Sequence, residues 1–203
     1  MQQVFLNRIP FAKFFMKKEL IYVPIIGLAC WALDFPVMKR YSKHYLKKHP
    51  EKKGQDLDET RRACERFKNR HVSVVNFVEG TRFTLHKHKQ QHSPFNHLLK
   101  PKAGGVALAL DVLGDKVKGV LNVTIVYPEQ HPGFWDFLCG MMTKVHIHIE
   151  LIEPATIPYQ HYYESEMAKV HFQAWINQLW LQNDRIMTKI LRDKLLNIDK
   201  AKQ

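Results

Sequence analysis

Four consecutive residues with chemically useful side chains follow an apolar run in the first half of the chain. The run Val74-Val75-Asn76-Phe77-Val78 leads directly into Glu79, Gly80, Thr81 and Arg82. A glycine allows backbone angles that other residues resist, so the chain can turn there and present the next two residues outward. The guanidinium of Arg82 fits a phosphate or carboxylate, and Glu79 can hold it in place. This group predicts an anion-binding turn; the alternative is an ordinary strand-to-loop turn with a surface ion pair.

The apolar run before these residues is typical of a strand inside a parallel sheet. Such strands are covered on both faces, so apolar and polar residues need not alternate. We predict a strand over residues 72–78, with Glu79 at its carboxyl end, where open α/β sheets bind ligands. Asp56 is a plausible N-cap for a preceding helix, in which Ala63, Cys64 and Phe67 share one face.

The polar stretch from Thr84 to Asn96 is predicted to be a mobile loop beside this turn. No Cys or carboxylate stands at metal-ligand spacing from its histidines, so we predict no metal site there. The histidines in or next to this stretch are His86, His88, His92 and His97.

The second half of the chain carries clear periodic patterns. Small and apolar residues predict a helix over 106–113, and β-rich runs predict strands over 121–127 and 145–152. Alternation in the later run makes it a half-exposed edge strand with His146 and His148 facing solvent. A stripe at helical spacing predicts a long amphipathic helix; it consists of Phe172, Trp175, Ile176, Leu179 and Trp180. The predicted fold class is α/β, a mostly parallel sheet covered by helices on both faces, with long C-terminal amphipathic helices.

Composition limits the size and the partners of the protein. The chain has 203 residues, 45% of them hydrophobic, which suits one domain with a sizeable core. Thirty-one Lys and Arg against nineteen Asp and Glu give a formal charge of +12. The partner surface is therefore expected to be anionic: nucleic acid, acidic phospholipid or an acidic carrier. Cys30, Cys64 and Cys139 are odd in number and scattered, which favours reduced, mostly packed thiols.

Two stretches near the start of the chain indicate a role at a membrane surface or in the core. Residues 1–19 mix Phe with Lys and Arg, which suits either an interfacial segment or a core-packed helix with a solvated cationic face. The most apolar stretch, Leu20 to Leu33, is fourteen residues long and contains Pro24 and Gly27. Since roughly twenty residues are needed to cross a bilayer, it favours a surface or buried role over a span.

Three stretches resemble motifs of one family in the same order. Phe77-Val78-Glu79-Gly80-Thr81-Arg82 resembles the acyl-acceptor motif, Phe-x-Glu-Gly-Thr-Arg, of the glycerolipid acyltransferases, the family of bacterial 1-acylglycerol-3-phosphate O-acyltransferases. Residues 17–27 with Val37-Met38-Lys39-Arg40 resemble its second motif, a Lys-rich turn with Pro-x-x-Gly and a terminal Arg. Pro101-Lys102-Ala103-Gly104-Gly105 resembles the segment after the third motif. Ordered matches over roughly residues 10–130 are more specific than one motif alone.

The resemblance implies an O-acyltransferase of phospholipid metabolism with an acyltransferase-like fold. It implies transfer of an acyl group from a thioester, acyl-CoA or acyl carrier protein, to a lysophosphatidate-like acceptor, without cofactor or metal. Arg82 and Arg40 would bind the acceptor phosphate, with Lys102 as a further candidate. Glu79 would position the Arg82 guanidinium, and Gly80 and Thr81 would shape the loop. Lys39 departs from the family, which usually has an acid before the terminal Arg. The implied location is the cytoplasmic face of the inner membrane, peripheral or anchored by a missing N-terminal segment.

The family also needs a His-x4-Asp motif upstream of the second motif, to remove the proton of the acceptor hydroxyl. No such motif precedes residue 17. The literal match His131 to Asp136 lies after the acceptor motif, contains a Pro-Gly turn and is expected by chance, so we assign it no catalytic role. Two explanations are open: an N-terminally truncated piece of a larger acyltransferase, or a gene product that has lost the reaction. Because the acceptor motif is intact, we expect residues 1–203 to be a single, N-terminally truncated acyltransferase-like domain that is inactive by itself.

The alternative hypothesis is a non-catalytic basic module that binds an anionic membrane or nucleic acid. The net charge and the Lys- and Phe-rich start favour it. Neither the aromatic strand motifs of RNA-binding modules nor zinc-ligand spacing is present, which disfavours nucleic acid.

Overall fold

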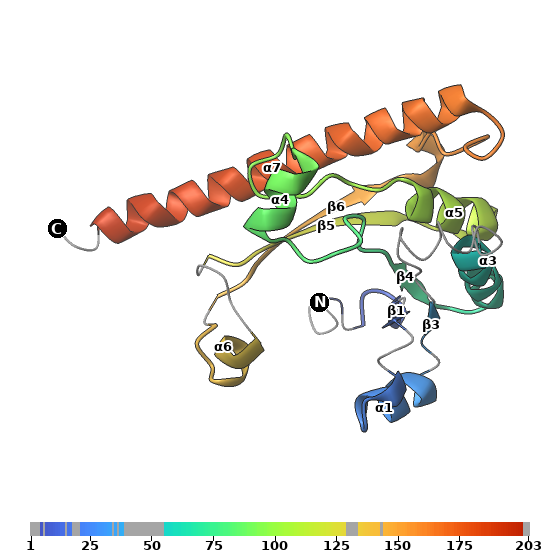
Figure 1. The fold of residues 1–203 in the computed structure, drawn as a ribbon, viewed down its shortest axis with the longest axis horizontal. Helices are drawn as coiled ribbons and strands as arrows, with labels where there is room; N and C mark the ends of the chain where they lie inside the picture. Colours follow the sequence, from blue (N-terminus) through green and yellow to red (C-terminus); the bar gives the residue numbers. More distant parts are fainter. Residues whose placement is uncertain are drawn as a thin grey trace. The chain divides into compact units, whose positions relative to one another are not determined.

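A computed structural model describes residues 5, 7–14, 16–17, 21–33, 35, 37–38, 55–128, 134–142 and 144–200 (Figure 1). The chain forms two compact units, Met1–Val78 with Lys102–Val117 and Glu79–Pro101 with Lys118–Gln203. The chain passes from the first unit to the second directly after Val78. The predicted strand and the polar residues that follow it therefore belong to different units.

The first unit contains short parallel strand pairs and two longer helices. β1 pairs with β4 in the register Ala12↔Ser73 to Phe14↔Val75, and β2 pairs with β3 in the register Met16↔Val37. The elements are β1 (Ala12–Phe14), β2 (Met16–Lys17), α1 (Ile26–Ala32), β3 (Val37–Met38), α3 (Gln55–Phe67), β4 (Ser73–Val75), α5 (Gly104–Leu113) and the 3-10 turn η3 (Gly114–Lys116).

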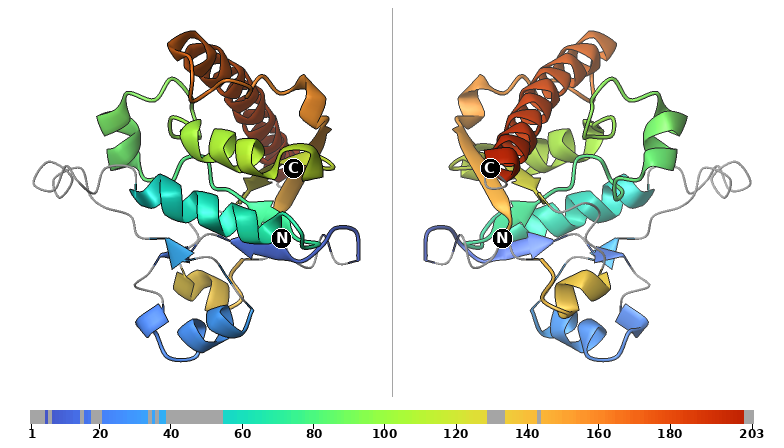
Figure 2. Two further views of the ribbon diagram at one scale, coloured as in Figure 1. Left: turned by 90° about the vertical axis from the view of Figure 1, so that its right-hand side faces the viewer. Right: turned by 90° about the vertical axis from the view of Figure 1, so that its left-hand side faces the viewer.

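The core of the first unit lies between α3 and α5, which run side by side (Figure 2). Cys64 of α3 packs with Leu108 and Val112 of α5, and all three are buried. Small residues in α5, such as Ala107, allow the two helices to approach closely. The predicted helical face of residues 56–67 and the predicted helix over 106–113 are confirmed.

The second unit is an antiparallel hairpin covered by one long helix. β5 pairs with β6 from Val120↔Ile152 to Val126↔His146, and α7 packs along β5 (Figure 1). The elements are α4 (Leu85–Gln91), β5 (Val120–Val126), α6 (Phe134–Leu138), β6 (His146–Ile152), the 3-10 turn η4 (Pro154–Thr156) and α7 (Glu166–Lys200). Phe172 and Ile176 of α7 are buried, as their helical spacing predicts.

Buried amides fix α7 on the hairpin. Asn183 of α7 and Asn122 of β5 exchange two side-chain hydrogen bonds of 2.9 and 3.0 Å. The Asn122 amide also donates to Glu150 Oε2 of β6 at 3.1 Å. A satisfied buried polar network of this kind specifies one register of helix against strand, because every shifted register would leave an amide unpaired.

The mixed α/β class is confirmed, whereas a single sheet covered on both faces is not. The strands in the described part of the chain form three two-stranded sheets, two parallel and one antiparallel. The strand predicted over 72–78 ends at Val75, and Phe77 is 62% exposed. The Val78 carbonyl accepts a 2.9 Å hydrogen bond from the Lys102 N–H, so it serves the next segment of the unit and not a strand ladder.

The patterns of the C-terminal half give correct elements. The runs over 121–127 and 145–152 are β5 and β6, and His146 and His148 are exposed. The amphipathic stripe lies on α7, a single helix of 35 residues.

The prediction of a loop over 84–96 is wrong for residues 85–91, which form α4. Thr84 caps this helix, because its Oγ1 accepts a hydrogen bond of 3.2 Å from the Lys87 N–H. No residue of α4 is buried, so the helix has no apolar periodicity that could reveal it. The predicted N-cap Asp56 is also wrong, since α3 begins at Gln55.

The described part of the N-terminal segment contains a short strand where a helix was one of the two interpretations. Residues 12–14 form β1, and Lys13 is buried. Its ammonium group donates to the Leu33 carbonyl and lies over the rings of Phe11 and Phe35 at 5.4 and 5.7 Å from their centroids. Within the described residues, no helix has the length and apolar character needed to cross a membrane.

The three cysteines are free thiols. Cys64 is buried, Cys30 is half-buried and Cys139 is exposed. Burial, with a smaller effect of the neighbouring Glu65 charge, raises the pKa of Cys64 to about 11. The Cys64 thiol is therefore protonated at neutral pH and acts as a packing residue, not as a nucleophile.

Candidate functional site

The predicted bend lies at Gly80. Its φ of 68° is in the left-handed region, which a side chain makes costly, so a glycine is favoured there. Thr81 and Arg82, the two residues after the bend, are exposed. This agrees with the expectation that Gly80 turns the chain and presents the next two side chains outward.

Arg82 offers an unoccupied cationic group. Among the described residues, its guanidinium makes no hydrogen bond or ion pair; only its backbone carbonyl is engaged. A planar, exposed guanidinium with free donors is suited to a bidentate contact with a phosphate or carboxylate.

Lys87 is a second cation at this turn that the sequence interpretation missed. Its ammonium group donates to Thr81 Oγ1 at 2.7 Å and to the Arg82 carbonyl at 3.3 Å. Thr84 fixes the first turn of α4, and that turn carries Lys87 back toward the bend. The signal in the sequence was the capping residue Thr84, which starts a helix three residues before Lys87. The ammonium group of Lys87 therefore lies against the turn whose next residue, Arg82, is exposed.

Glu79 is held from the side of α7. Burial raises its pKa above the ordinary value of 4.5, while the Leu99 backbone N–H and the Trp180 indole lower it in part. The indole Nε1 of Trp180 is buried and has no hydrogen-bond partner among the described residues. No ion pair joins Glu79 to Arg82 in this part of the chain. The contacts that are present position Glu79 itself.

The segment that carries Leu99 is fixed by α7. Asp184, which is buried, accepts hydrogen bonds from the backbone N–H groups of Asn96 and His97 at 2.9 and 2.7 Å. Gln173 of the same helix donates to the Pro101 carbonyl at 3.2 Å. The helix therefore determines where the Leu99 N–H meets Glu79.

Lys102 belongs to the other compact unit. Its side chain is exposed, and its backbone N–H holds the Val78 carbonyl at the end of the first unit. The structure thus brings together Glu79, Gly80, Thr81 and Arg82 within the second unit, with Lys87 added. Arg40 and Lys39 lie outside the described residues.

His131 also lies outside the described residues, so the geometry of the His131–Asp136 match is not part of the site. Asp136 is half-buried in α6. The part of the chain that the structure describes contains no group of three or more His, Cys, Asp or Glu side chains that could hold a metal ion. In the His-rich stretch, His88 Nε2 pairs with the Phe95 carbonyl at 2.6 Å and so has a structural contact.

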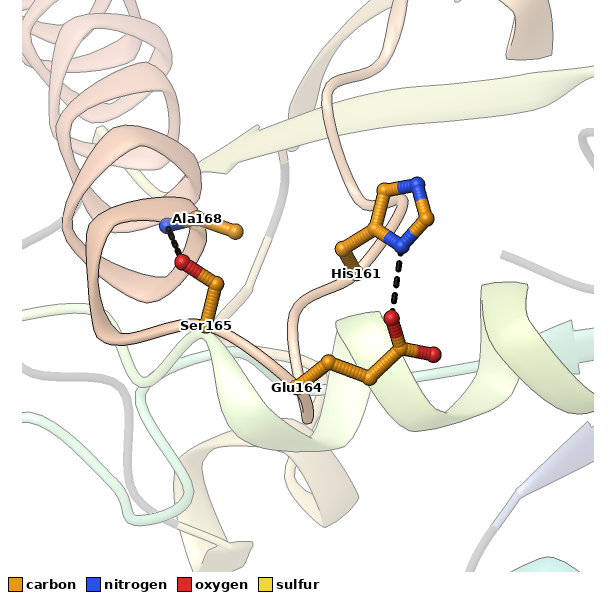
Figure 3. A network of polar contacts seen from close by, with 4 residues as sticks. All are labelled: His161, Glu164, Ser165 and Ala168. Carbon is orange, nitrogen blue, oxygen red and sulfur yellow. Dashed lines mark hydrogen bonds and ion pairs between the residues drawn. The ribbon is translucent and has the colours of Figure 1, made fainter.

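An open pocket of about 500 Å³ lies at the start of α7, lined by Gln160, His161, Ser165, Met167, Ala168 and His171. Figure 3 shows its polar contacts: His161 Nδ1 pairs with Glu164 Oε2 at 2.7 Å, and Ser165 Oγ accepts from the Ala168 N–H at 3.4 Å. Ser165 therefore caps the helix, and its contact is with the backbone, not with the imidazole. These contacts end a turn and start a helix.

Comparisons with known proteins agree on one family. The family model described as "Acyltransferase" matches residues 3–128. A probable 1-acyl-sn-glycerol-3-phosphate acyltransferase 5 of Arabidopsis thaliana is 28% identical over 200 residues, covering 91% of this chain and 45% of that protein. The 1-acyl-sn-glycerol-3-phosphate acyltransferase gamma of Homo sapiens is 24% identical over 186 residues, covering 86% of this chain and 44% of that protein.

A third relative is 1-acyl-sn-glycerol-3-phosphate acyltransferase epsilon of Mus musculus, 24% identical over 134 residues, with 56% of this chain and 34% of that protein covered. The chain thus spans less than half the length of these relatives. No solved structure gave a significant match. The matched residues 3–128 include the bend at Gly80 and both cations beside it.

Proposed function

This chain belongs to the acyltransferase family. From that membership we propose that it is part of an O-acyltransferase of phospholipid metabolism. The acceptor in this proposal is a lysophosphatidate-like lipid, in line with the names of the relatives. The donor is an acyl thioester, acyl-CoA or acyl carrier protein. No cofactor or metal takes part, because the thioester already supplies the activation.

One observation carries the assignment of the acceptor site. Arg82 is exposed with an unpaired guanidinium, and Lys87 stands beside it through its bond to Thr81. A phosphate monoester is a compact dianion, and paired cations on a fixed turn recognise it through charge-assisted hydrogen bonds. Glu79, Gly80 and Thr81 shape the turn.

The proposal leaves the general base to residues outside these 203. The sequence lacks a His-x4-Asp motif ahead of residue 17, which is where the family has it. In this proposal the chain by itself binds the acceptor but does not transfer the acyl group. In this proposal the enzyme acts at the cytoplasmic face of the inner membrane.

Binding of a soluble, short-chain lysophosphatidate to the 203-residue chain tests the acceptor site. Arg82→Ala should weaken binding by about 10- to 100-fold, because a hydrogen bond to a charged group contributes about 1.5–3 kcal/mol. Lys87→Met should weaken it less, by about tenfold, since its ammonium already bonds to Thr81. Isothermal titration calorimetry measures both affinities.

Matched controls are Arg185→Ala on α7 and Lys89→Met on α4, which remove an exposed cation of the same type outside the turn. Both should retain the affinity of the wild type. Equal losses in Arg82→Ala and Arg185→Ala would mean that the lipid responds only to net charge. In the complete enzyme, Arg82→Ala should impair use of the acceptor far more than use of the thioester; equal effects would contradict the assigned role.

The alternative function, a non-catalytic basic module, makes a different prediction. Tight binding of duplex DNA without binding of lysophosphatidate would favour that module. Transfer of a labelled acyl group by the 203-residue chain alone would contradict the external general base.

A further inference from the structure

A short apolar projection in the first unit exposes large side chains. We call residues 21–33 the α1 tip; it contains α1 and no charged residue. Its most exposed side chains are Tyr22 (74%), Ile25 (82%), Leu28 (69%) and Trp31 (78%). Figure 1 shows α1 standing clear of α3 and α5. Contiguous exposed apolar surface of this kind marks a place of interaction.

The backbone of the α1 tip has a defined, tightly folded conformation. The Gly27 N–H donates to the Val23 carbonyl at 2.8 Å, so the chain folds back at the start of α1. A Cβ at Gly27 would collide with the carbonyl oxygen of Ile21, so only glycine permits this close approach. The close packing of backbone on backbone leaves the side chains of the tip to point outward.

The base of the tip is anchored to the rest of the unit. Lys13 of β1 donates to the Leu33 carbonyl at the end of α1. The rings of Phe11 and Phe35 pack against each other at 6.2 Å and lie beside the same ammonium group. A fixed base means that the exposed side chains are presented without an ordering cost on binding.

Basic residues flank the apolar tip in the sequence. Lys17 and Lys18 precede it together with Glu19, and Lys39 and Arg40 follow it after Asp34. Residues 1–54 contain eleven Lys and Arg against three acidic residues. An uncharged, aromatic-containing tip between cationic flanks matches a surface that is apolar inside and anionic at its rim.

We propose that the α1 tip inserts into the interface of an anionic phospholipid membrane. Trp31 and Tyr22 lie at the headgroup level, where their amphipathic rings are favoured, while Ile25 and Leu28 enter the acyl boundary. The helix has seven residues and is roughly 10 Å long, so it lies in one interface and does not cross the bilayer. The proposal rests on the proposed function in one respect, that a lipid acceptor is met at a membrane.

The chemistry of the tip favours lipid over a protein partner. A protein interface mixes its apolar anchors with a polar rim of hydrogen-bonding side chains. The tip has only the phenol of Tyr22 and the indole of Trp31 as strong side-chain donors over thirteen residues. The complementary charges lie in the flanking segments, as they do in interfacial membrane anchors.

Flotation of the 203-residue chain with vesicles of phosphatidylcholine and phosphatidylglycerol tests the proposal. Leu28→Asp should reduce the vesicle partition coefficient by at least about tenfold, because it puts a charge in place of an exposed leucine that enters the acyl boundary in this proposal. The matched control is Leu151→Asp on β6, since Leu151 is also 69% exposed. It should change partitioning by less than about twofold, as surface substitutions away from a binding face do.

Quenching by brominated lipids supplies an independent readout. Trp31→Phe should remove most of the lipid-dependent quenching of tryptophan fluorescence, and Trp135→Phe should remove little. Equal flotation of wild type and Leu28→Asp, or equal losses in Leu28→Asp and Leu151→Asp, would overturn the proposal. So would loss of a chain–chain dimer in Leu28→Asp with unchanged flotation, which would assign the tip to a second copy.

Different experiments test the acceptor site at Arg82 and the membrane insertion of the α1 tip, so either proposal can be contradicted without the other. Leu28→Asp should bind soluble short-chain lysophosphatidate as the wild type does, since no vesicle is present. Arg82→Ala should lose no more flotation than Arg185→Ala, since each variant removes one exposed arginine outside the α1 tip. Failure of the acceptor experiment with intact, tip-dependent flotation would leave the membrane inference standing, and the reverse result would leave only the acceptor site.

Discussion

At the scale of single residues, the turn after β4 combines groups that have different electrostatic needs. Arg82 faces solvent, and the ammonium group of Lys87 donates to a neighbouring hydroxyl. Glu79 is half-buried, so its charged form is disfavoured. The carboxylate that the family motif places beside the arginine is therefore held at a cost in stability.

Replacing Glu79 should reveal that cost through its pH dependence. Because burial raises the folded-state pKa above 4.5, the contribution of Glu79 to stability is fully present below the unfolded pKa. It is lost as the pH rises through the folded pKa. Glu79→Gln stays neutral, so at neutral pH its free energy of unfolding should exceed that of wild type by less than about 1 kcal/mol, since solvent screens a half-buried group.

Urea unfolding across a pH series measures this difference, which should vanish under acidic conditions, below the unfolded pKa. Glu153→Gln, an exposed site before η4, is the control and should follow the wild type at every pH. A wild type that becomes more stable relative to Glu79→Gln between mildly acid and neutral pH would contradict the raised pKa.

The residues of the turn were predictable to different degrees. Gly80, Thr81 and Arg82 follow from a local motif, and the positive φ at Gly80 is a property of that residue itself. Lys87, Leu99 and Trp180 reach the turn through the fold, from a helix without buried residues, a loop and a distant helix. No short-range pattern in the sequence records such contacts, so sequence reasoning missed them.

At the scale of elements, α7 organises the second unit. Its apolar stripe packs on β5, Asn183 pairs with the amide of Asn122, and Asp184 holds the loop that carries Leu99. These polar contacts come from adjacent positions of the helix, so one turn of α7 sets both the hairpin register and the loop position.

Removal of Asp184 tests this role. Asp184 is 3% exposed and accepts bonds from two backbone N–H groups, so Asp184→Ala should lower the free energy of unfolding by about 2–4 kcal/mol. Asp193→Ala, an exposed position of the same helix, should change it by no more than about 0.5 kcal/mol. Urea unfolding measures both.

Amide hydrogen exchange locates the effect. The Asn96 and His97 amides should exchange faster in Asp184→Ala, while the amides of α3 and α5 should not change. Uniformly faster exchange in both units would mean that Asp184 stabilises the whole chain and does not hold this loop in particular.

The elements that sequence patterns predicted are those whose pattern reports burial. The stripe from Phe172 to Trp180 and the β-rich run of β5 are packed as their periodicity indicates. The predicted length of β4 was wrong. The strand ends at Val75, and the Val78 carbonyl accepts a hydrogen bond from the N–H of Lys102, a residue far away in the sequence. The helix α4 was missed because a cap, and no apolar face, stabilises it.

At the scale of the whole molecule, the formal charge of +12 acts over a longer range than any single contact. It raises the local concentration of every anionic partner, so it explains attraction without choosing among nucleic acid, lipid and carrier protein. The choice comes from smaller features, namely the turn at Gly80 and the α1 tip.

Salt should separate these contributions to vesicle binding. The Debye length falls from about 10 Å at about 0.1 M salt to about 3 Å at about 1 M, so the attraction from distributed charge should disappear. Wild-type flotation should fall with salt but remain above that of Leu28→Asp, because apolar insertion is not screened. Identical values for the two proteins at high salt would mean that charge alone holds the chain on the vesicle.

The crowded backbone at Gly27 offers a way to divide the protein's two proposed tasks genetically. A single methyl group at that position, Gly27→Ala, would force the fold-back open without touching the turn at Gly80. If the α1 tip is the anchor, the Gly27→Ala protein would still bind soluble lysophosphatidate but would no longer bind the bilayer. One added carbon atom would then separate the two functions.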